Sequence, residues 1–208
     1  MIRWIISSAD GGVGRMKLAP FIFVTGGVRC GKSSFAEKVA LAKALKRNGN
    51  LHYIACGRPV DDEMRGRIKL HQANREECGF SWTTWEQPNA IGNLATEFSN
   101  TDVVLLDCLT TLLNNELFRE KSSWKNPHFQ DDVKETIISD LECLRETCGS
   151  LILVSNEVLN EVPIDNPLVF TYTSLLGQLH QSIVKNCTSA ILVEAGIPFS
   201  MKGSLPSV

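Results

Sequence analysis

Apolar and polar positions follow two different periods along this chain. Short runs of apolar residues recur between longer stretches in which apolar residues are spaced three and four positions apart. The short runs predict buried strands, and the longer stretches predict helices that pack by one face. The predicted strands span residues 21–25, 51–55, 81–86, 103–107, 151–155 and 190–194. The predicted helices span residues 33–46, 61–75, 88–98, 109–118, 131–148 and 168–185.

The order of these elements predicts the fold class. Strands alternate with helices throughout, as in an α/β protein with a mostly parallel sheet and helices on both faces. Strand 190–194 is interpreted as the last strand of the sheet and segment 121–130 as a polar loop. Residues 20–208 are long enough for a single domain. Residues 1–19 are expected to form an extension outside the core, with little fixed structure.

A glycine-rich segment joins the first predicted strand to the first predicted helix. Its sequence, Gly-Gly-Val-Arg-Cys-Gly-Lys-Ser over residues 26–33, fits the pattern G-x-x-x-x-G-K-[ST] of a phosphate-binding loop. Such a loop aims backbone N–H groups and a helix N-terminus at one point, where an anionic phosphate binds. Lys32 would add a positive charge near the terminal phosphates, and Ser33 a hydroxyl ligand for Mg²⁺. The motif predicts a nucleoside triphosphate and leaves the reaction open.

Asp107 ends the apolar strand 103–107, which is the pattern of a Walker B strand. Its carboxylate would emerge at the carboxyl edge of the sheet, where it could hold Mg²⁺ directly or through water. The alternative is an Asp that caps the helix beginning at Leu109, and the complete phosphate loop favours the metal role. The segment Ser155-Asn156-Glu157-Val158 would add polar groups to the same edge, or could simply end its strand.

Composition gives no reason to favour several classes of protein. The formal net charge is -2, and no long basic run favours nucleic acid as a partner. No segment is long and apolar enough to be a membrane span. The seven cysteines are scattered and form no C-x-x-C pair, so neither a zinc site nor a disulfide framework is indicated. Reduced thiols in a cytoplasmic protein are expected, and Cys30 is interpreted as a tolerated small residue in the phosphate loop.

A second group of candidate residues lies on the predicted helix 61–75. Arg67, His71 and Arg75 are four residues apart and therefore share one face of that helix. Two guanidinium groups disfavour protonation of the imidazole between them, which would leave a neutral nucleophile able to attack an α-phosphorus. The residues alone leave open a solvated face with an incidental histidine. The other histidines give weaker signals: His52 lies in a strand, His128 in a loop and His180 on a partly apolar helix.

In combination, these segments resemble the bifunctional adenosylcobinamide kinase / adenosylcobinamide-phosphate guanylyltransferase family of cobalamin biosynthesis. The resemblance runs from about residue 21 to 197, and its most specific parts are D-D-E-M…R-I-x-x-H and D-C-L-T. The matching stretches are residues 24–33, 53–55, 61–71, 82–86, 106–110 with Asn115, 155–158, and Gly177 with Gln181.

The resemblance implies a RecA-like phosphate-loop sheet in a homotrimer. It implies that the enzyme phosphorylates adenosylcobinamide, with ATP or GTP as donor, and then transfers GMP from GTP to that phosphate through a guanylylated histidine, here His71. By the same resemblance, Lys32 joins His71 as a catalytic residue, and Ser33 and Asp107 hold Mg²⁺. The implied nucleotide contacts are Gly26, Gly27, Val28, Arg29, Cys30, Gly31, Lys32, Ser33, Ala55, Cys56, Gly57, Gln72, Ala73, Asn74, Arg75, Glu86 and Asp107.

The C-terminal third departs from the family pattern. Segment 156–163 lacks the glycines of N-E-V-G-x-G-I-V-P and is one residue shorter. Thr173-Ser174 replaces an Arg-Asp pair, and His180 replaces an Asn. These changes leave two alternatives open: an enzyme with only one of the activities, guanylyl transfer being favoured, or a nucleotide-binding regulatory protein without corrinoid turnover.

Overall fold

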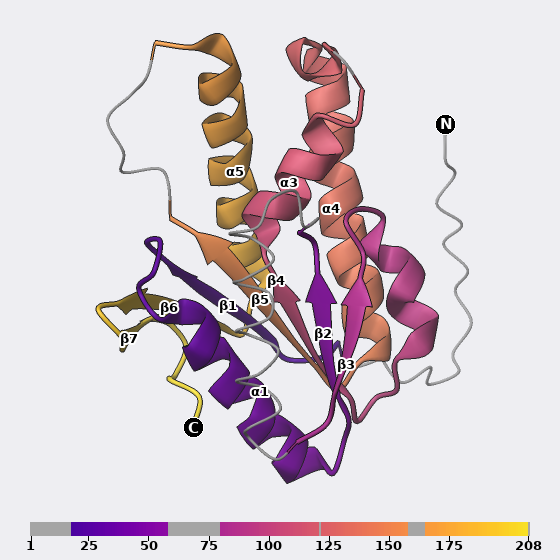
Figure 1. Cartoon of the computed structure of the whole chain (residues 1–208), viewed down its shortest axis with the longest axis vertical. Helices are drawn as coiled ribbons and strands as arrows, with labels where there is room; N and C mark the ends of the chain where they lie inside the picture. Colours follow the sequence, from indigo (N-terminus) through magenta and orange to yellow (C-terminus); the bar gives the residue numbers. More distant parts are fainter. Residues whose placement is uncertain (1–17, 58–79, 121, 158–164, 208) are drawn as a thin grey trace, which may run out of the picture.

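The computed structural model describes residues 18–57, 80–120, 122–157 and 165–207 (Figure 1). The described residues form one seven-stranded sheet in the order β3-β2-β4-β5-β1-β6-β7. The strands are β1 (Phe21–Gly26), β2 (Leu51–Ala55), β3 (Trp82–Glu86), β4 (Val103–Asp107), β5 (Ser150–Asn156), β6 (Ser189–Glu194) and β7 (Ile197–Lys202). The helices are α1 (Lys32–Arg47), η1 (Ile91–Glu97), α3 (Leu109–Leu117), η2 (Ser123–Lys125), α4 (Pro127–Thr147) and α5 (Pro167–Asn186).

The central strands are apolar along both faces because helices cover both faces of the sheet. On one face, α1 packs over Ile22 and Val24 of β1 in one cluster of buried side chains. On the other face, α3, α4 and α5 pack over Phe21 and Phe23 in a second cluster. In Figure 1, α3 and α5 also rise beyond the tips of the strands. This arrangement confirms the predicted α/β fold with a mostly parallel sheet and helices on both faces.

The prediction that strand 190–194 is the last of the sheet is wrong, because β7 follows it and pairs antiparallel with β6. The two strands are joined by Ala195 and Gly196, which both have positive φ, 49° and 81°. Two left-handed residues form the tight hairpin turn that matches the twist of neighbouring strands. The short loop left too little sequence between the two strands to mark them as separate elements.

Two helical segments also differ from the prediction. α4 begins at Pro127 rather than at residue 131, because the side chain of Asn126 accepts a hydrogen bond from the backbone N–H of His128 and caps the helix. Proline at the first helical position suits this start. Segment 88–98 contains the 3₁₀ helix η1 instead of an α-helix. No helix among the described residues is long and apolar enough to cross a membrane.

Candidate functional site

The phosphate loop runs from the end of β1 to the start of α1. Gly31 is the N-cap residue of α1 and has φ of 92°, a left-handed conformation that glycine adopts without strain. Arg29 is also left-handed, with φ of 61°. The Lys32 ammonium folds back and donates to the backbone oxygen of Gly27 at 3.1 Å. The loop thus encloses its lysine and presents the first turn of α1 to the carboxyl edge of the sheet.

The turn between β6 and β7 supports this loop from one side. The backbone N–H of Gly196 donates to the backbone oxygen of Cys30 at 2.8 Å. A Cβ atom on Gly31 would lie 3.3 Å from the Cα of Gly196, and one on Gly26 would collide with the backbone oxygen of Val193. Sequence reasoning missed this contact; the Ala195-Gly196 dipeptide was the available sign of a turn.

Asp107 ends β4, two strands away from the phosphate loop across β5. It is half-buried and pairs in register with Ala55 of β2 and Val154 of β5. Cys108, and not Asp107, occupies the N-cap position of α3. The capping alternative for Asp107 is therefore not supported, and its carboxylate lies at the edge where the metal role would place it.

The end of β5 connects the phosphate loop to the region around Asp107. The backbone N–H of Glu157 donates to the backbone oxygen of Gly26 at 2.9 Å. The side-chain amide of Asn156 donates to Thr110 Oγ1 at 3.0 Å, at the start of α3. The polar segment predicted to add groups to this edge therefore bridges two parts of the candidate site.

The ends of β2 and β3 complete this edge of the sheet. Ala55 pairs in register with Glu86, whose side chain is exposed. The side-chain amide of Asn115 donates to the backbone oxygens of Cys56 and Pro88, both at 2.8 Å, and so holds the two strand ends together. Asn115 was singled out only as part of the family match, and the structure gives it this bridging contact.

Two thiols of the site are unsuited to act as nucleophiles. Burial raises the pKa of Cys56 well above its ordinary value, and the nearby Cys108 and Asp107 add to the shift. Burial also raises the pKa of Cys108, whose Sγ lies 2.9 Å from Thr110 Oγ1. Because the thiolate is the nucleophilic form, neither side chain competes with a histidine for that role.

The donor set for a magnesium ion is small. The described residues contain no group of three or more His, Cys, Asp or Glu side chains that could hold a metal by themselves. Mg²⁺ prefers oxygen ligands, keeps several waters and binds through one or two protein groups plus substrate phosphates. The hydroxyl of Ser33 and the carboxylate of Asp107 fit that pattern of few protein oxygens.

Several predicted site residues lie outside the described part of the chain. These are Arg67, His71, Gln72, Ala73, Asn74, Arg75 and the altered segment from residue 158 to 163. The structure therefore brings Gly26–Ser33, Ala55–Gly57, Glu86 and Asp107 to one edge of the sheet. It leaves the stripe of Arg67, His71 and Arg75 as a prediction from the sequence.

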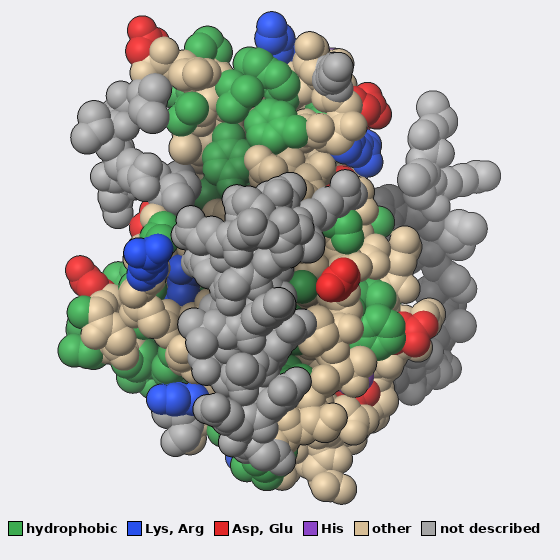
Figure 2. Space-filling view, viewed as in Figure 1, with side chains coloured by type: hydrophobic (Ala, Val, Ile, Leu, Met, Phe, Trp, Pro, Cys, Tyr) green, Lys and Arg blue, Asp and Glu red, His purple; other side chains and the backbone are tan. Residues whose placement is uncertain are grey.

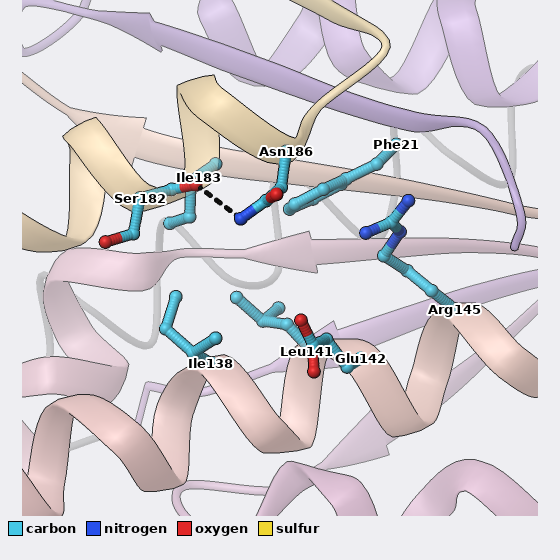
Figure 3. Close-up of a pocket in the computed structure, with 8 residues that line it drawn as sticks. All are labelled: Phe21, Ile138, Leu141, Glu142, Arg145, Ser182, Ile183 and Asn186. Atoms are coloured by element: carbon cyan, nitrogen blue, oxygen red, sulfur yellow. Dashed lines mark hydrogen bonds between the residues drawn. The ribbon is translucent and has the colours of Figure 1, made fainter. Parts of the chain in front are cut away.

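A small cavity lies elsewhere, between α4 and α5 near the amino end of β1. Figure 3 shows Phe21, Ile138, Leu141, Arg145 and Ile183 among the side chains that line it. Its volume is about 10 Å³, about the space of one water molecule. Figure 2 shows hydrophobic side chains gathered on the upper part of the molecule, around α3, α4 and α5. This cavity cannot hold a nucleotide.

Comparison with known proteins identifies a family and relatives. The model of a family described as cobinamide kinase / cobinamide phosphate guanyltransferase matches residues 22–201. The bifunctional adenosylcobalamin biosynthesis protein CobP of Pseudomonas aeruginosa is 37% identical over 182 residues, which cover 86% of this chain and 96% of the relative. The protein CobU of Escherichia coli (strain K12), with the same description, is 28% identical over 187 residues, which cover 87% of this chain and 99% of the relative. Among solved structures, the flagellar accessory protein FlaH from Methanocaldococcus jannaschii is similar with a TM-score of 0.45 and 13% identity, over 90% of this chain and 80% of that chain.

Proposed function

The chain belongs to the cobinamide kinase / cobinamide phosphate guanyltransferase family. We propose that it transfers GMP from GTP to cobinamide phosphate through a guanylylated His71. It is a bifunctional kinase and nucleotidyltransferase of adenosylcobalamin biosynthesis. The observation that carries the assignment to a site is the phosphate loop of residues 26–33, with Asp107 on the same edge of the sheet.

The kinase reaction needs a triphosphate held by its β- and γ-phosphates. The acceptor hydroxyl oxygen bonds to the γ-phosphorus and its proton passes to solvent. The bond from that phosphorus to the bridging oxygen breaks, and the nucleoside diphosphate leaves with the electron pair. The loop amides and Lys32 stabilise the negative charge that develops on the phosphate oxygens. Arg29, at the exposed side of the loop, adds a second positive charge, and ATP and GTP present the same phosphates to these groups.

The guanylyl transfer divides into two displacements. A ring nitrogen of His71 bonds to the α-phosphorus of GTP, and pyrophosphate leaves with the electron pair of the broken bond. The phosphate oxygen of cobinamide phosphate then attacks the same phosphorus, the bond from phosphorus to His71 breaks, and the guanylylated product is released. The guanidinium groups of Arg67 and Arg75, each four residues from His71, would keep its imidazole neutral for the first step. They would also supply positive charges for the phosphates.

We propose that Mg²⁺ binds with the nucleotide. Ser33 and Asp107 would hold it, and when bound it would neutralise charge on the phosphates. We also propose the remaining nucleotide contacts at Ala55–Gly57, Gln72–Arg75 and Glu86, and a homotrimeric assembly, on the family resemblance. Light scattering after size-exclusion chromatography measures the assembly directly.

Protein labelling from GTP tests the central role of His71. After incubation with α-³²P-GTP, the unaltered enzyme is expected to carry an acid-labile label, and the His71→Asn variant none. Phosphorylation of cobinamide from γ-³²P-ATP should persist in this variant, which shows that the protein is folded. His128→Asn is the matched control because His128 is exposed at the start of α4, and it should label normally. A labelled His71→Asn variant would contradict the proposal.

A further inference from the structure

His180 lies on the side of α5 that faces the sheet, near the carboxyl ends of β1 and β5. Its Nε2 is 2.8 Å from Ser155 Oγ, and both side chains are buried. Its ring packs edge-on against Phe23 of β1, with the ring centroids 5.1 Å apart. One imidazole from α5 therefore contacts the strand that leads into the phosphate loop and the strand beside it.

Ser155 directly precedes the two residues that connect β5 to the candidate site. Asn156 bonds to Thr110 beside Asp107, and Glu157 bonds to the backbone of Gly26. Asn156 is the last residue of β5 and Glu157 directly follows it, so a displacement of Ser155 would be passed along the backbone to both of these contacts. The bond to His180 thus acts on the phosphate loop through only one or two residues.

Among the described residues, the neighbouring hydroxyl on β1 makes no comparable bond. Thr25 pairs in register with Ser155, in the residue just before the phosphate loop. Its Oγ1 is buried and has no hydrogen-bond partner among the described residues. Of these two neighbouring hydroxyl groups, that of Ser155 on β5 has a hydrogen-bond partner, which is the imidazole of His180.

We propose that His180 is a positioning residue for the phosphate site, because its bond to Ser155 fixes the end of β5 and, through it, Gly26 and Thr110. The imidazole takes no part in phosphoryl transfer. The inference rests on the proposed phosphate site and is independent of His71.

Burial, and not a neighbouring charge, keeps His180 neutral at pH 7. β1 carries no ionisable side chain. The groups on the other elements packed against α5 include Glu157 after β5, Cys108 and Glu116 at α3, Lys125 in η2, and Lys134, Glu142 and Arg145 on α4, and of these only Glu157 shifts the pKa of His180. Burial lowers the pKa of His180, and the charge of Glu157 opposes this shift only in part. Protonation at acidic pH would place a charge beside Phe23 and change the donor at the Ser155 bond, so the positioning should weaken there.

The experiment compares His180→Gln and His180→Leu with the unaltered enzyme. Affinity for a fluorescent GTP analogue and kcat/KM of the kinase reaction are measured between pH 5.5 and 8. His180→Leu should lose about tenfold in nucleotide affinity at pH 7.5, as expected when a buried hydroxyl loses a hydrogen-bond partner. His180→Gln, whose amide can still reach Ser155, should lose less than about threefold. The ratio of kcat/KM between the unaltered enzyme and His180→Gln should fall toward acidic pH, because only the imidazole titrates.

His52→Gln is the matched control. His52 is as buried as His180, but it lies on β2 and accepts a hydrogen bond from Trp85 on the edge strand β3, away from β1 and β5. This variant should lower the thermal midpoint without changing nucleotide affinity or the pH ratio. Unchanged affinity in His180→Leu together with a pH-independent ratio for His180→Gln would overturn the proposal. If His180→Leu does not fold, the proposal is tested by the pH dependence of the ratio of kcat/KM between the unaltered enzyme and His180→Gln. Failure of the His71 labelling test would leave these measurements unaffected.

Discussion

Different groups hold the strand ends together at the two edges of the sheet. At the amino edge, the buried Asp102 joins the starts of β2, β4 and β5: its carboxylate accepts from the N–H groups of Asn50 and Ser99, and its backbone oxygen from Gly149. At the carboxyl edge, backbone and amide bonds join the strand ends, whereas Asp107 stays half-buried. The amino edge uses its carboxylate within the fold, and the carboxyl edge leaves the carboxylate of Asp107 where the proposed metal role needs it. Substitutions at the amino edge should therefore lower stability, and substitutions at the carboxyl edge should lower activity.

The largest expected effect is at the carboxyl edge, in Lys32→Ala. Loss of the loop cation should lower kcat/KM for both reactions by about 10²- to 10³-fold, because its charge is used at the phosphates. The thermal midpoint should fall only slightly, since the ammonium loses one bond, to the backbone oxygen of Gly27. Steady-state kinetics with labelled ATP and GTP, together with thermal unfolding, measure both quantities. A loss below tenfold would remove Lys32 from its assigned role.

At the amino edge, Asp102→Ala should act on stability alone. Three N–H donors from Asn50 and Ser99 would lose a buried carboxylate, at a cost of about 3 kcal/mol in the free energy of unfolding. Urea unfolding measures the loss, and kcat per folded molecule should stay unchanged. Asp131→Ala is the control, because Asp131 is exposed and forms an ion pair with Lys134 on the same helix. It should change neither the free energy of unfolding nor kcat.

Two glycines sharpen the comparison, because both are closely packed. Gly31→Ala would force a left-handed alanine into the phosphate loop, at a cost of about 1–2 kcal/mol, and should weaken nucleotide affinity about tenfold. Gly49→Ala would push a Cβ into the backbone oxygen of Thr101 at the amino edge. It should lower the urea midpoint without weakening nucleotide binding. Equal affinities for the two variants would show that the edges are not functionally distinct.

The smallest expected effect is the pH dependence of stability from His52. Burial lowers the pKa of His52 despite the opposing charge of Asp102, so the unfolded chain binds a proton at higher pH than the folded one. Its contribution is complete above the ordinary pKa of about 6.5 and is lost as the pH falls below it, by at most about 1.4 kcal/mol per pH unit. The pKa of Asp102 is lowered, since bonds from Ser99 and Asn50 outweigh the effect of its burial, so its contribution is lost only below about pH 4. Urea midpoints at pH 5.5 and 7.5 should therefore differ in the unaltered protein and differ less in His52→Gln, where the remaining difference includes that of His180, whose pKa burial also lowers.

The sequence predicted well where the signal is local. The phosphate loop is a contiguous motif, and the apolar runs around Phe23 and Leu105 show their strands without reference to the rest of the chain. Asp107 was found for the same reason, since an acid directly after an apolar run stands out.

Hydrogen bonds between residues far apart in the sequence could not be predicted. Asp102 and Asn50 are 52 positions apart, and Ser155 and His180 are 25 apart, so no periodicity shows that they bond. His180 was set aside because a lone histidine on an apolar helix carries no sign of its partner. β7 was missed because it packs its residues 197–202 at an edge, where exposed Phe199 and Met201 do not give the pattern of a buried strand.

The bond from Gly196 to Cys30 has a consequence for synthesis of the protein. Translation produces residues 26–33 early, but the turn that supports their loop appears only when Gly196 has been added. A nascent or prematurely terminated chain therefore carries the complete phosphate motif without its support.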